Sequence, residues 1–94
     1  MLTISRTSRF KRDLKRIVMG QYGKELDRIL TEAFTFLLME EALPARYRDH
    51  SLAGDYQDCR ECHLKPDLLL IYRKIDDDTL QLTRLGTHSE LFGK

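Results

Sequence analysis

The chain has 94 residues, of which 41% are hydrophobic and 33% are charged, and its formal net charge is +1. This length predicts one domain, spanning residues 1–94, with a single core. No apolar run is long enough to span a membrane and no signal peptide is evident, so we expect no membrane partner. Two cysteines without an export signal predict a cytoplasmic protein.

Positive charge is concentrated in the first half of the chain. Residues 1–48 carry ten Lys/Arg and six Asp/Glu, whereas residues 49–94 carry six and nine. A stripe of basic side chains on one helix can bind along a phosphate backbone. A solvated helix face has the same composition and is the simpler interpretation. Residues 6–16 contain a single acidic residue, Asp13, and six basic residues that form this stripe: Arg6, Arg9, Lys11, Arg12, Lys15 and Arg16.

The first half predicts a short strand and two amphipathic helices. Leu2 and Ile4 alternate with polar residues, which is typical of a strand. We expect the first helix to begin after an N-cap within residues 5–8, and the second to run from about residue 24 to residue 41, before Pro44. Each helix has one apolar face to bury: Phe10, Leu14, Ile17 and Val18 in the first, and Leu26, Ile29, Leu30, Ala33, Phe36 and Leu37 in the second.

The second half predicts four strands. A short one follows His50 and includes residues 54–56, and the others span residues 59–64, 67–74 and 79–85. The third has apolar residues on both faces, which is typical of a central strand. The element order predicts an α+β fold, in which an N-terminal strand and a helical hairpin pack on one face of a mainly antiparallel sheet of four to five strands. The other face of the sheet is expected to be free for a site.

The C-x-x-C pair of Cys59 and Cys62 is interpreted as two ordinary thiols. Residues three apart in a strand point to opposite faces, so one metal or redox site cannot use both. The same alternation places Cys62 and Leu64 on one face, and Glu61 and His63 on the other. These sets predict a core face and an open face.

The hairpin after His63 predicts a specific contact. A two-residue loop of Lys65 and Pro66 would put proline at the second central position of the turn, where it is disfavoured. We therefore expect a three-residue loop, Leu64 to Pro66, which places His63 directly opposite Asp67. The carboxylate would orient the imidazole and favour its charged form.

All three histidines of the chain lie in the second half, at strand edges. Histidine can both take and give protons near neutral pH. Together with a carboxylate and an arginine, these side chains predict proton transfer at a phosphodiester. Their spacing matches no short zinc motif, so we expect no metal and no other cofactor. The candidate residues are His50, His63, Asp67, Arg84 and His88.

Phe92 has two interpretations of similar weight. It could stack on a base that is splayed out of an RNA strand. It could equally be an apolar plug that holds the end of the chain against the sheet.

Three segments carry a resemblance to a known family: Asp49-His50-Ser51-Leu52-Ala53-Gly54, the run from Arg60 to Tyr72, and Gly86-Thr87-His88-Ser89-Glu90-Leu91-Phe92. They resemble the YafQ branch of the RelE-like bacterial toxins, and the resemblance extends over nearly the whole chain. It implies a type II toxin that cleaves messenger RNA on the ribosome and is silenced by a cognate antitoxin. Operator DNA would be bound only through that antitoxin. The chain departs from many YafQ-like sequences at Leu68, where they have an aromatic residue.

The resemblance also implies roles for the candidate residues. His50, His63 and Asp67 are candidates for the general base and for its orientation, and the choice among them stays open. His88 is the expected general acid and Arg84 the expected phosphate ligand, while Phe92 and Lys65 are expected to bind substrate. Two alternatives remain: a non-catalytic toxin resembling the ParE type, which binds DNA gyrase, and an inactive remnant that binds only its antitoxin.

Overall fold

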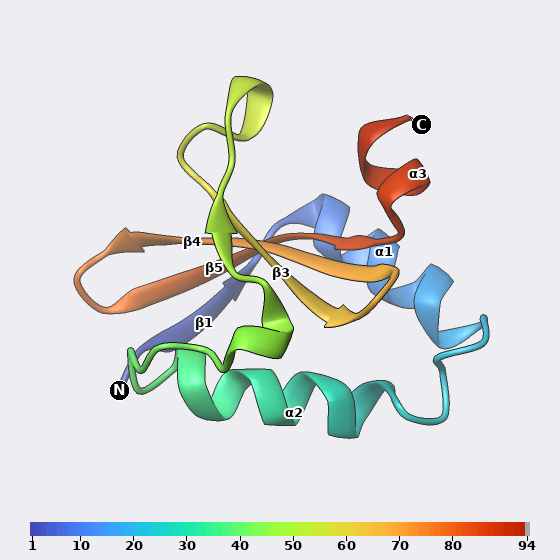
Figure 1. Ribbon diagram of the computed structural model, residues 1–94, viewed down its shortest axis with the longest axis horizontal. Coiled ribbons are helices and arrows are strands. Elements are labelled where there is room, and N and C mark those ends of the chain that lie inside the picture. Colours follow the sequence, from blue (N-terminus) through green and yellow to red (C-terminus); the bar gives the residue numbers. More distant parts are fainter. Residues whose placement is uncertain (94) are drawn as a thin grey trace.

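The computed structural model describes residues 1–93 and contains a five-stranded sheet and three α-helices (Figure 1). The first strand pairs in parallel with the last, and every other neighbouring pair is antiparallel. This arrangement confirms the predicted α+β fold with a mainly antiparallel sheet. The strands lie side by side in the order β1 (Thr3–Arg6), β5 (Thr79–Gly86), β4 (Leu68–Asp76), β3 (Arg60–Lys65) and β2 (His50–Ser51).

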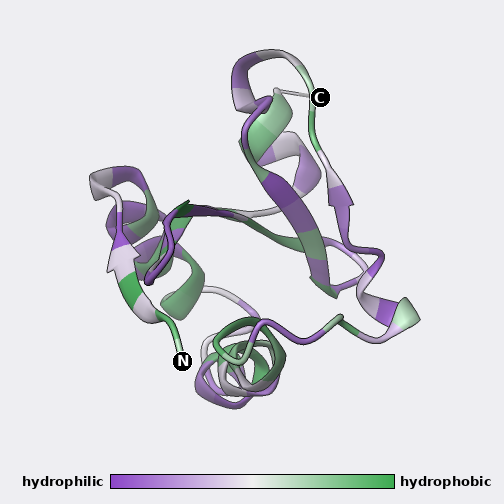
Figure 2. Cartoon of the chain, turned by 90° about the vertical axis from the view of Figure 1, so that its left-hand side faces the viewer, coloured by the Kyte–Doolittle hydropathy of each residue, from purple (hydrophilic) through white to green (hydrophobic). Residues whose placement is uncertain are grey.

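Two helices, α1 (Ser8–Val18) and α2 (Leu26–Leu37), cover one face of the sheet, as the sequence predicts. The α1 N-cap is Thr7, whose hydroxyl accepts a hydrogen bond from the Phe10 N–H at 2.9 Å. Figure 2 shows α2 end-on, with its hydrophobic side turned toward the sheet. At 12 residues α2 is the longest helix, and no helix within residues 1–93 has the length and hydrophobicity to cross a membrane.

The second helix ends earlier than the sequence predicts. It stops at Leu37 instead of continuing to Glu41, so Pro44 does not terminate it. Glu40 adopts a left-handed backbone conformation (φ 57°), and the N–H groups of Glu40 and Glu41 bond back to the carbonyls of Leu37 and Phe36. This is the Schellman arrangement, which satisfies the last carbonyls of a helix without any proline.

The central strand β4 is buried on both faces, as its apolar run predicts. On the helix side, Leu68 and Leu70 belong to the main core. On the other side, Leu69 and Ile71 form a smaller cluster with Leu91, with Cys59 and with half-buried aromatic residues. The face expected to be open is therefore partly filled.

The connections on that second face also differ from the prediction. Residues 54–56 form a short 3₁₀ helix, η2 (Gly54–Tyr56), and β2 is limited to His50–Ser51. The end of the chain folds into the short helix α3 (His88–Phe92), which begins with a capping box between Thr87 and Glu90. The segment with η2 and helix α3 rise from the same side of the sheet (Figure 1).

A buried carboxylate joins α1 to the end of β5. Asp13 is 2% exposed and accepts four hydrogen bonds. Arg84 donates two of them, from Nε at 2.7 Å and Nη2 at 3.1 Å, and the Leu85 N–H donates a third at 3.0 Å. Arg16 Nη1 donates the fourth at 3.0 Å. Burial alone would raise the pKa of Asp13, but these donors outweigh it and hold the pKa below its ordinary value.

Arg16 extends this clamp to the last helix. Its Nε lies 2.8 Å from Glu90 Oε2, and its Nη2 donates to the Leu85 carbonyl at 3.1 Å. The backbone at Gly86 has to pass beneath these groups, because a Cβ there would lie 2.8 Å from Arg16 Nη2 and 2.9 Å from Glu90 Oε1. A glycine at this position lets α1, β5 and α3 meet.

Replacing Asp13 by alanine should lower the free energy of unfolding by about 3–5 kcal/mol, because it leaves the half-buried Arg84 guanidinium without its anion. Urea denaturation monitored by circular dichroism measures this loss. The matched control is Asp77→Ala in the exposed β4–β5 turn, which should change stability by less than about 0.5 kcal/mol. Equal effects of the two substitutions would contradict a structural role for the clamp.

The clamp should also make stability depend on acid pH. The folded pKa of Asp13 is lowered, so its contribution is complete above the ordinary value of 3.8 and is lost as the pH falls through the folded value. The stability gap between the wild type and Asp13→Asn should therefore be constant near neutral pH and shrink below about pH 4. Thermal melts at stepwise pH measure the gap, and a gap that is independent of pH would exclude this linkage.

Candidate active site

The strand register places the candidate residues in two neighbouring rows on the face opposite α1 and α2. One row crosses the four strands β2, β3, β4 and β5 as His50, Glu61, Ile71 and Arg84. Neighbouring strands lie about 4.8 Å apart, so Arg84 and Glu61 are separated by roughly 10 Å across the apolar Ile71. The second row runs from His63 through Leu69 to Gly86, directly before Thr87 and His88.

Glu61 lies between two histidines. Its Oε1 is 3.6 Å from His50 Nε2 and 3.4 Å from His63 Nε2, and the two rings are 6.4 Å apart. The Glu61 side chain is only 5% exposed, whereas those of His63 and His50 are 19% and 49% exposed. The nearly buried Glu61 carboxylate thus has both imidazole Nε2 atoms within 3.6 Å of one of its oxygens.

The hydrogen bond on the far side of His50 determines which of its nitrogens carries hydrogen. Nδ1 lies 2.7 Å from the carbonyl oxygen of Arg48, which can only accept, so Nδ1 carries the hydrogen. The nitrogen facing Glu61 is then Nε2, which holds a proton only in the imidazolium form. The lone pair of His50 Nε2 therefore faces the carboxylate that also lies beside His63 Nε2, and these three side chains form one unit.

The sequence analysis placed Glu61 on the open face with His63 but did not include it among the candidate residues. Strand alternation could have suggested the contact with His63. The contact with His50 depends on the pairing of His50 in β2 with Glu61 in β3. The sequence instead predicts a short strand after His50 that includes residues 54–56.

The predicted pairing of His63 with Asp67 is wrong. The turn is a two-residue loop of Pro66 and Asp67, with Lys65 opposite Leu68 and His63 opposite Leu69. Proline occupies the first central position, which its fixed φ favours. A register shift between His63 and Lys65 accommodates the remaining residue.

Asp67 instead contacts the start of α3. Its Oδ1 accepts a hydrogen bond from the backbone N–H of His88 at 3.2 Å. The hairpin turn thus tethers the segment that carries His88. The structure brings Asp67 and His88 together, and it separately brings His50 and His63 together.

Arg84 is held in a defined position by Asp13. Hydrogen bonds to that carboxylate raise the pKa of Arg84 above its already high ordinary value, so the guanidinium stays charged. Its third nitrogen, Nη1, lies 3.4 Å from the Tyr56 hydroxyl on the site face. The side chain is 16% exposed, which leaves part of the cation accessible to a ligand.

Phe92 packs within an aromatic group at the end of the site. Its ring centroid is 4.9 Å from that of His88 and 6.1 Å from that of Tyr56, and it adjoins the smaller apolar cluster. The ring is half-buried. These contacts support the plug, while the partial exposure leaves a surface for stacking.

The two cysteines lie on opposite faces of the sheet, as the alternation predicts. Cys62 is in the main core and Cys59 is in the smaller cluster. Burial, reinforced by the charges of Asp49 and Glu61, raises the pKa of the Cys62 thiol to about 12. No group of three or more His, Cys, Asp or Glu side chains within residues 1–93 is arranged to hold a metal ion.

Comparison with known proteins gives consistent matches. Residues 2–93 match the family model described as the bacterial toxin of a type II toxin–antitoxin system, YafQ. The chain is 49% identical over 51 residues to the mRNA interferase toxin YafQ of Escherichia coli K12, and this match spans about half of either protein (54%).

Two solved structures agree with the fold over nearly the full chain. A metal-bound toxin from Helicobacter pylori superposes with a TM-score of 0.82 at 45% identity, covering 98% of this chain and 100% of that one. A chain of the E. coli DinJ–YafQ complex superposes with a TM-score of 0.79 at 34% identity, covering 99% of this chain and 100% of that one.

Proposed function

The chain belongs to the YafQ family of bacterial type II toxins, and we propose that it is a cytoplasmic endoribonuclease that cleaves messenger RNA on the ribosome without a metal. The observation that carries the proposal is the buried carboxylate of Glu61 between two histidines, on the same sheet face as Arg84. The mRNA interferase name of the E. coli relative supports the substrate class.

Cleavage begins with removal of the proton from a ribose 2′-hydroxyl. The 2′-oxygen attacks the adjacent phosphorus, so that a P–O2′ bond forms. The unit of His50, Glu61 and His63 accepts the proton, and the Glu61 charge stabilises the imidazolium that results. The proton is assigned to the unit as a whole, because both imidazole Nε2 atoms lie within 3.6 Å of the same carboxylate oxygen.

Negative charge that builds up on the phosphate needs a fixed cation. Arg84 is the residue for this role, because Asp13 holds its guanidinium in place before the substrate arrives. Preorganised charge of this kind stabilises a transition state without a reorganisation cost at the moment of reaction. The Asp13 carboxylate accepts from two of the five N–H groups and the Tyr56 hydroxyl from a third, which leaves two for a phosphate.

Departure of the 5′-oxygen needs an acid. His88 is exposed at the start of α3, where Asp67 holds its backbone and the Phe92 ring lies beside its imidazole. It protonates the leaving 5′-oxygen as the P–O5′ bond breaks. Asp67 then acts as an orienting residue. Phe92 and Lys65 bind the RNA on either side of the reacting phosphate.

A site spread over a sheet face needs help to align a flexible RNA strand. The ribosome holds messenger RNA in a defined path and can supply that alignment. This requirement, together with the small size of the protein, supports ribosome-dependent cleavage.

Loss of a proton-transfer group should abolish cleavage. His88→Ala and Glu61→Gln should each reduce the cleavage rate by roughly 10²–10⁴-fold, as expected for removal of general acid–base catalysis. Mapping of RNA 5′ ends after induced expression measures the effect in cells. A translation extract with intact ribosomes provides the rate.

Glu41→Gln, an exposed carboxylate after α2, is the matched control and should cleave like the wild type. Full toxicity of a folded His88→Ala or Asp67→Ala variant would remove that residue from the mechanism. Growth arrest without new RNA ends would favour gyrase binding, and no arrest would favour an inactive remnant. Cleavage that EDTA abolishes and zinc restores would replace the metal-free chemistry with a metal site.

We also propose a docking surface for the antitoxin, whose existence is supported by the DinJ–YafQ complex. A groove of about 280 Å³ lies beside edge strand β1, between α1 and α2. Most of its lining is apolar: Ile4, Phe10, Leu14, Leu30, Phe34 and Leu82, with Arg6 at the rim. Operator DNA would be reached only through the bound antitoxin.

Exposed cations of α1, the helix that contributes Phe10 and Leu14 to this groove, can attract an acidic, partly disordered antitoxin segment. Arg9, Lys11, Arg12 and Lys15 are exposed, and so is Arg16, but its guanidinium is already paired with Asp13 and Glu90. Apolar contacts in the groove would then keep the segment bound.

Reversing two charges, Arg12→Glu and Lys15→Glu, should slow antitoxin association because the stripe no longer attracts an acidic partner. The defect should shrink as salt rises, since the Debye length falls from about 10 Å at 0.1 M to about 3 Å at 1 M. Stopped-flow mixing measures the rate. Lys24→Glu, outside the stripe, is the control, and an unchanged rate at low salt would place the antitoxin elsewhere.

A further inference from the structure

A pocket of about 490 Å³ lies at the outer edge of β3, beyond the point where β2 stops pairing with it. Strand β2 pairs only with Arg60 and Glu61, so the edge from Cys62 to Lys65 has no neighbouring strand in the described chain. The segment with η1 (Ala45–Tyr47) forms the opposite wall. The volume is in the range of small-ligand sites, about 300–1,000 Å³.

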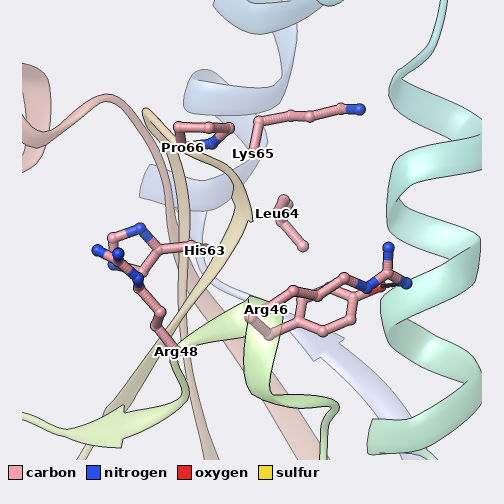
Figure 3. A pocket seen from close by; sticks show the side chains of 7 residues that line it. Arg46, Arg48, His63, Leu64, Lys65 and Pro66 are labelled. Carbon is pink, nitrogen blue, oxygen red and sulfur yellow. Dashed lines mark hydrogen bonds between the residues drawn. The ribbon is translucent and has the colours of Figure 1, made fainter.

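The pocket adjoins the proton-transfer unit. His63 lines it at one end, and Figure 3 shows the Arg48 side chain extending to the same end. Leu64 lies in the middle of the view, and Lys65 and Pro66 close the pocket above it. A ligand in this pocket would therefore contact the side chain next to the proposed base.

Two cations of the pocket have no anion of their own. Neither the Arg48 guanidinium nor the Lys65 ammonium has an ion-pair partner among residues 1–93. Arg46 differs, because it lies over the Tyr47 ring at 4.8 Å and approaches Glu32 at 3.7 Å. Arg48 and Lys65 are free to bind an external anion, while Arg46 and Tyr47 form a stacked wall.

The backbone at Arg48 is held in an unusual conformation. It is left-handed (φ 48°, ψ 39°), which a residue other than glycine rarely adopts. Its N–H bonds to the Ala45 carbonyl at 3.0 Å, and its carbonyl is 2.7 Å from His50 Nδ1. The same residue thus orients His50 with its backbone and lines the pocket with its side chain.

We propose that this pocket is a nucleotide subsite, which holds the RNA residue adjacent to the cleaved phosphodiester. Arg48, at the His63 end, and Lys65, at the Pro66 end, bind the phosphates on either side of that residue. Its base and ribose lie against Leu64, Pro66 and the stacked wall, as unstacked RNA bases do on aromatic rings and guanidinium planes. The inference rests on the proposed function, since it assumes that RNA is the substrate.

The test uses the full chain and a fluorescein-labelled RNA pentanucleotide with 2′-O-methyl riboses, which lack the 2′-hydroxyl and cannot be cleaved. Binding is measured by fluorescence anisotropy over a salt series. Arg48→Gln should weaken binding about tenfold or more, because it removes a charged hydrogen bond. It should also reduce the slope of log K against log salt by about 0.7, the value for one phosphate on a single strand. Lys65→Gln should reduce the slope similarly.

Lys24→Gln is the matched control, because it removes an exposed charge far along the chain from the pocket. It should leave affinity and slope unchanged. Equal binding by the wild type, Arg48→Gln and Lys65→Gln would overturn the subsite, as would no binding by the wild type at millimolar RNA.

Cleavage in the translation extract, measured in parallel, separates the subsite from the proposed function. Arg48→Gln should raise the protein concentration needed for half-maximal cleavage and leave the maximal rate within a few-fold, whereas His88→Ala lowers the maximal rate. A wild type that binds the pentanucleotide through Arg48 but never cleaves would retain the subsite and overturn the endoribonuclease. If the wild type cleaves but Arg48→Gln binds RNA normally, the endoribonuclease is retained and the subsite is overturned.

Discussion

The arrangement of the molecule depends on one buried carboxylate, that of Asp13. Four donors from α1 and β5 converge on its two oxygens, and Arg16 continues the chain of contacts to Glu90 in α3. Strand β5 and helix α3 follow one another in the sequence, whereas α1 lies far from both, with 71 positions between Asp13 and Arg84. A charge that is costly to leave unpaired is what keeps them in a single geometry.

The second buried carboxylate, Glu61, has a different chemical environment. Asp13 is neutralised by guanidinium groups, which keep their charge at all physiological pH values. Glu61 is next to two imidazoles, and an imidazole can accept or donate a proton, which a guanidinium cannot. The protein therefore has one fixed and one exchangeable charge centre on opposite sides of Ile71. The fixed centre suits the positioning of Arg84, and the exchangeable centre suits proton transfer.

Much of the fold could be predicted from the sequence because the responsible patterns are local. The double-sided apolar run of β4 and the alternation along β3 assigned the faces of Cys62 and Glu61 correctly. The prediction failed at the β3–β4 turn. The loop is Pro66–Asp67 instead of Leu64 to Pro66, so Asp67 lies in the turn and bonds to α3 instead of pairing with His63. Pairing register amplifies such a change, because each residue shift turns a side chain to the other face.

The contacts of the site are less predictable than the fold because they join distant segments. Asp13 and Arg84 are 71 residues apart, and no spacing rule connects them. The left-handed conformation of Arg48 carries no glycine or asparagine signal that would identify it. Both features follow from tertiary packing.

The parallel pairing of β1 with β5 has a consequence for the order of folding. The first strand can complete its hydrogen bonds only with residues 79–82, so the edge of the sheet closes after almost the entire chain is present. Contacts between such distant segments carry a large loop-closure entropy and form late. During synthesis, α1 and its Asp13 emerge long before Arg84 does. The carboxylate of Asp13 therefore stays without its Arg84 partner until β5 has been synthesised.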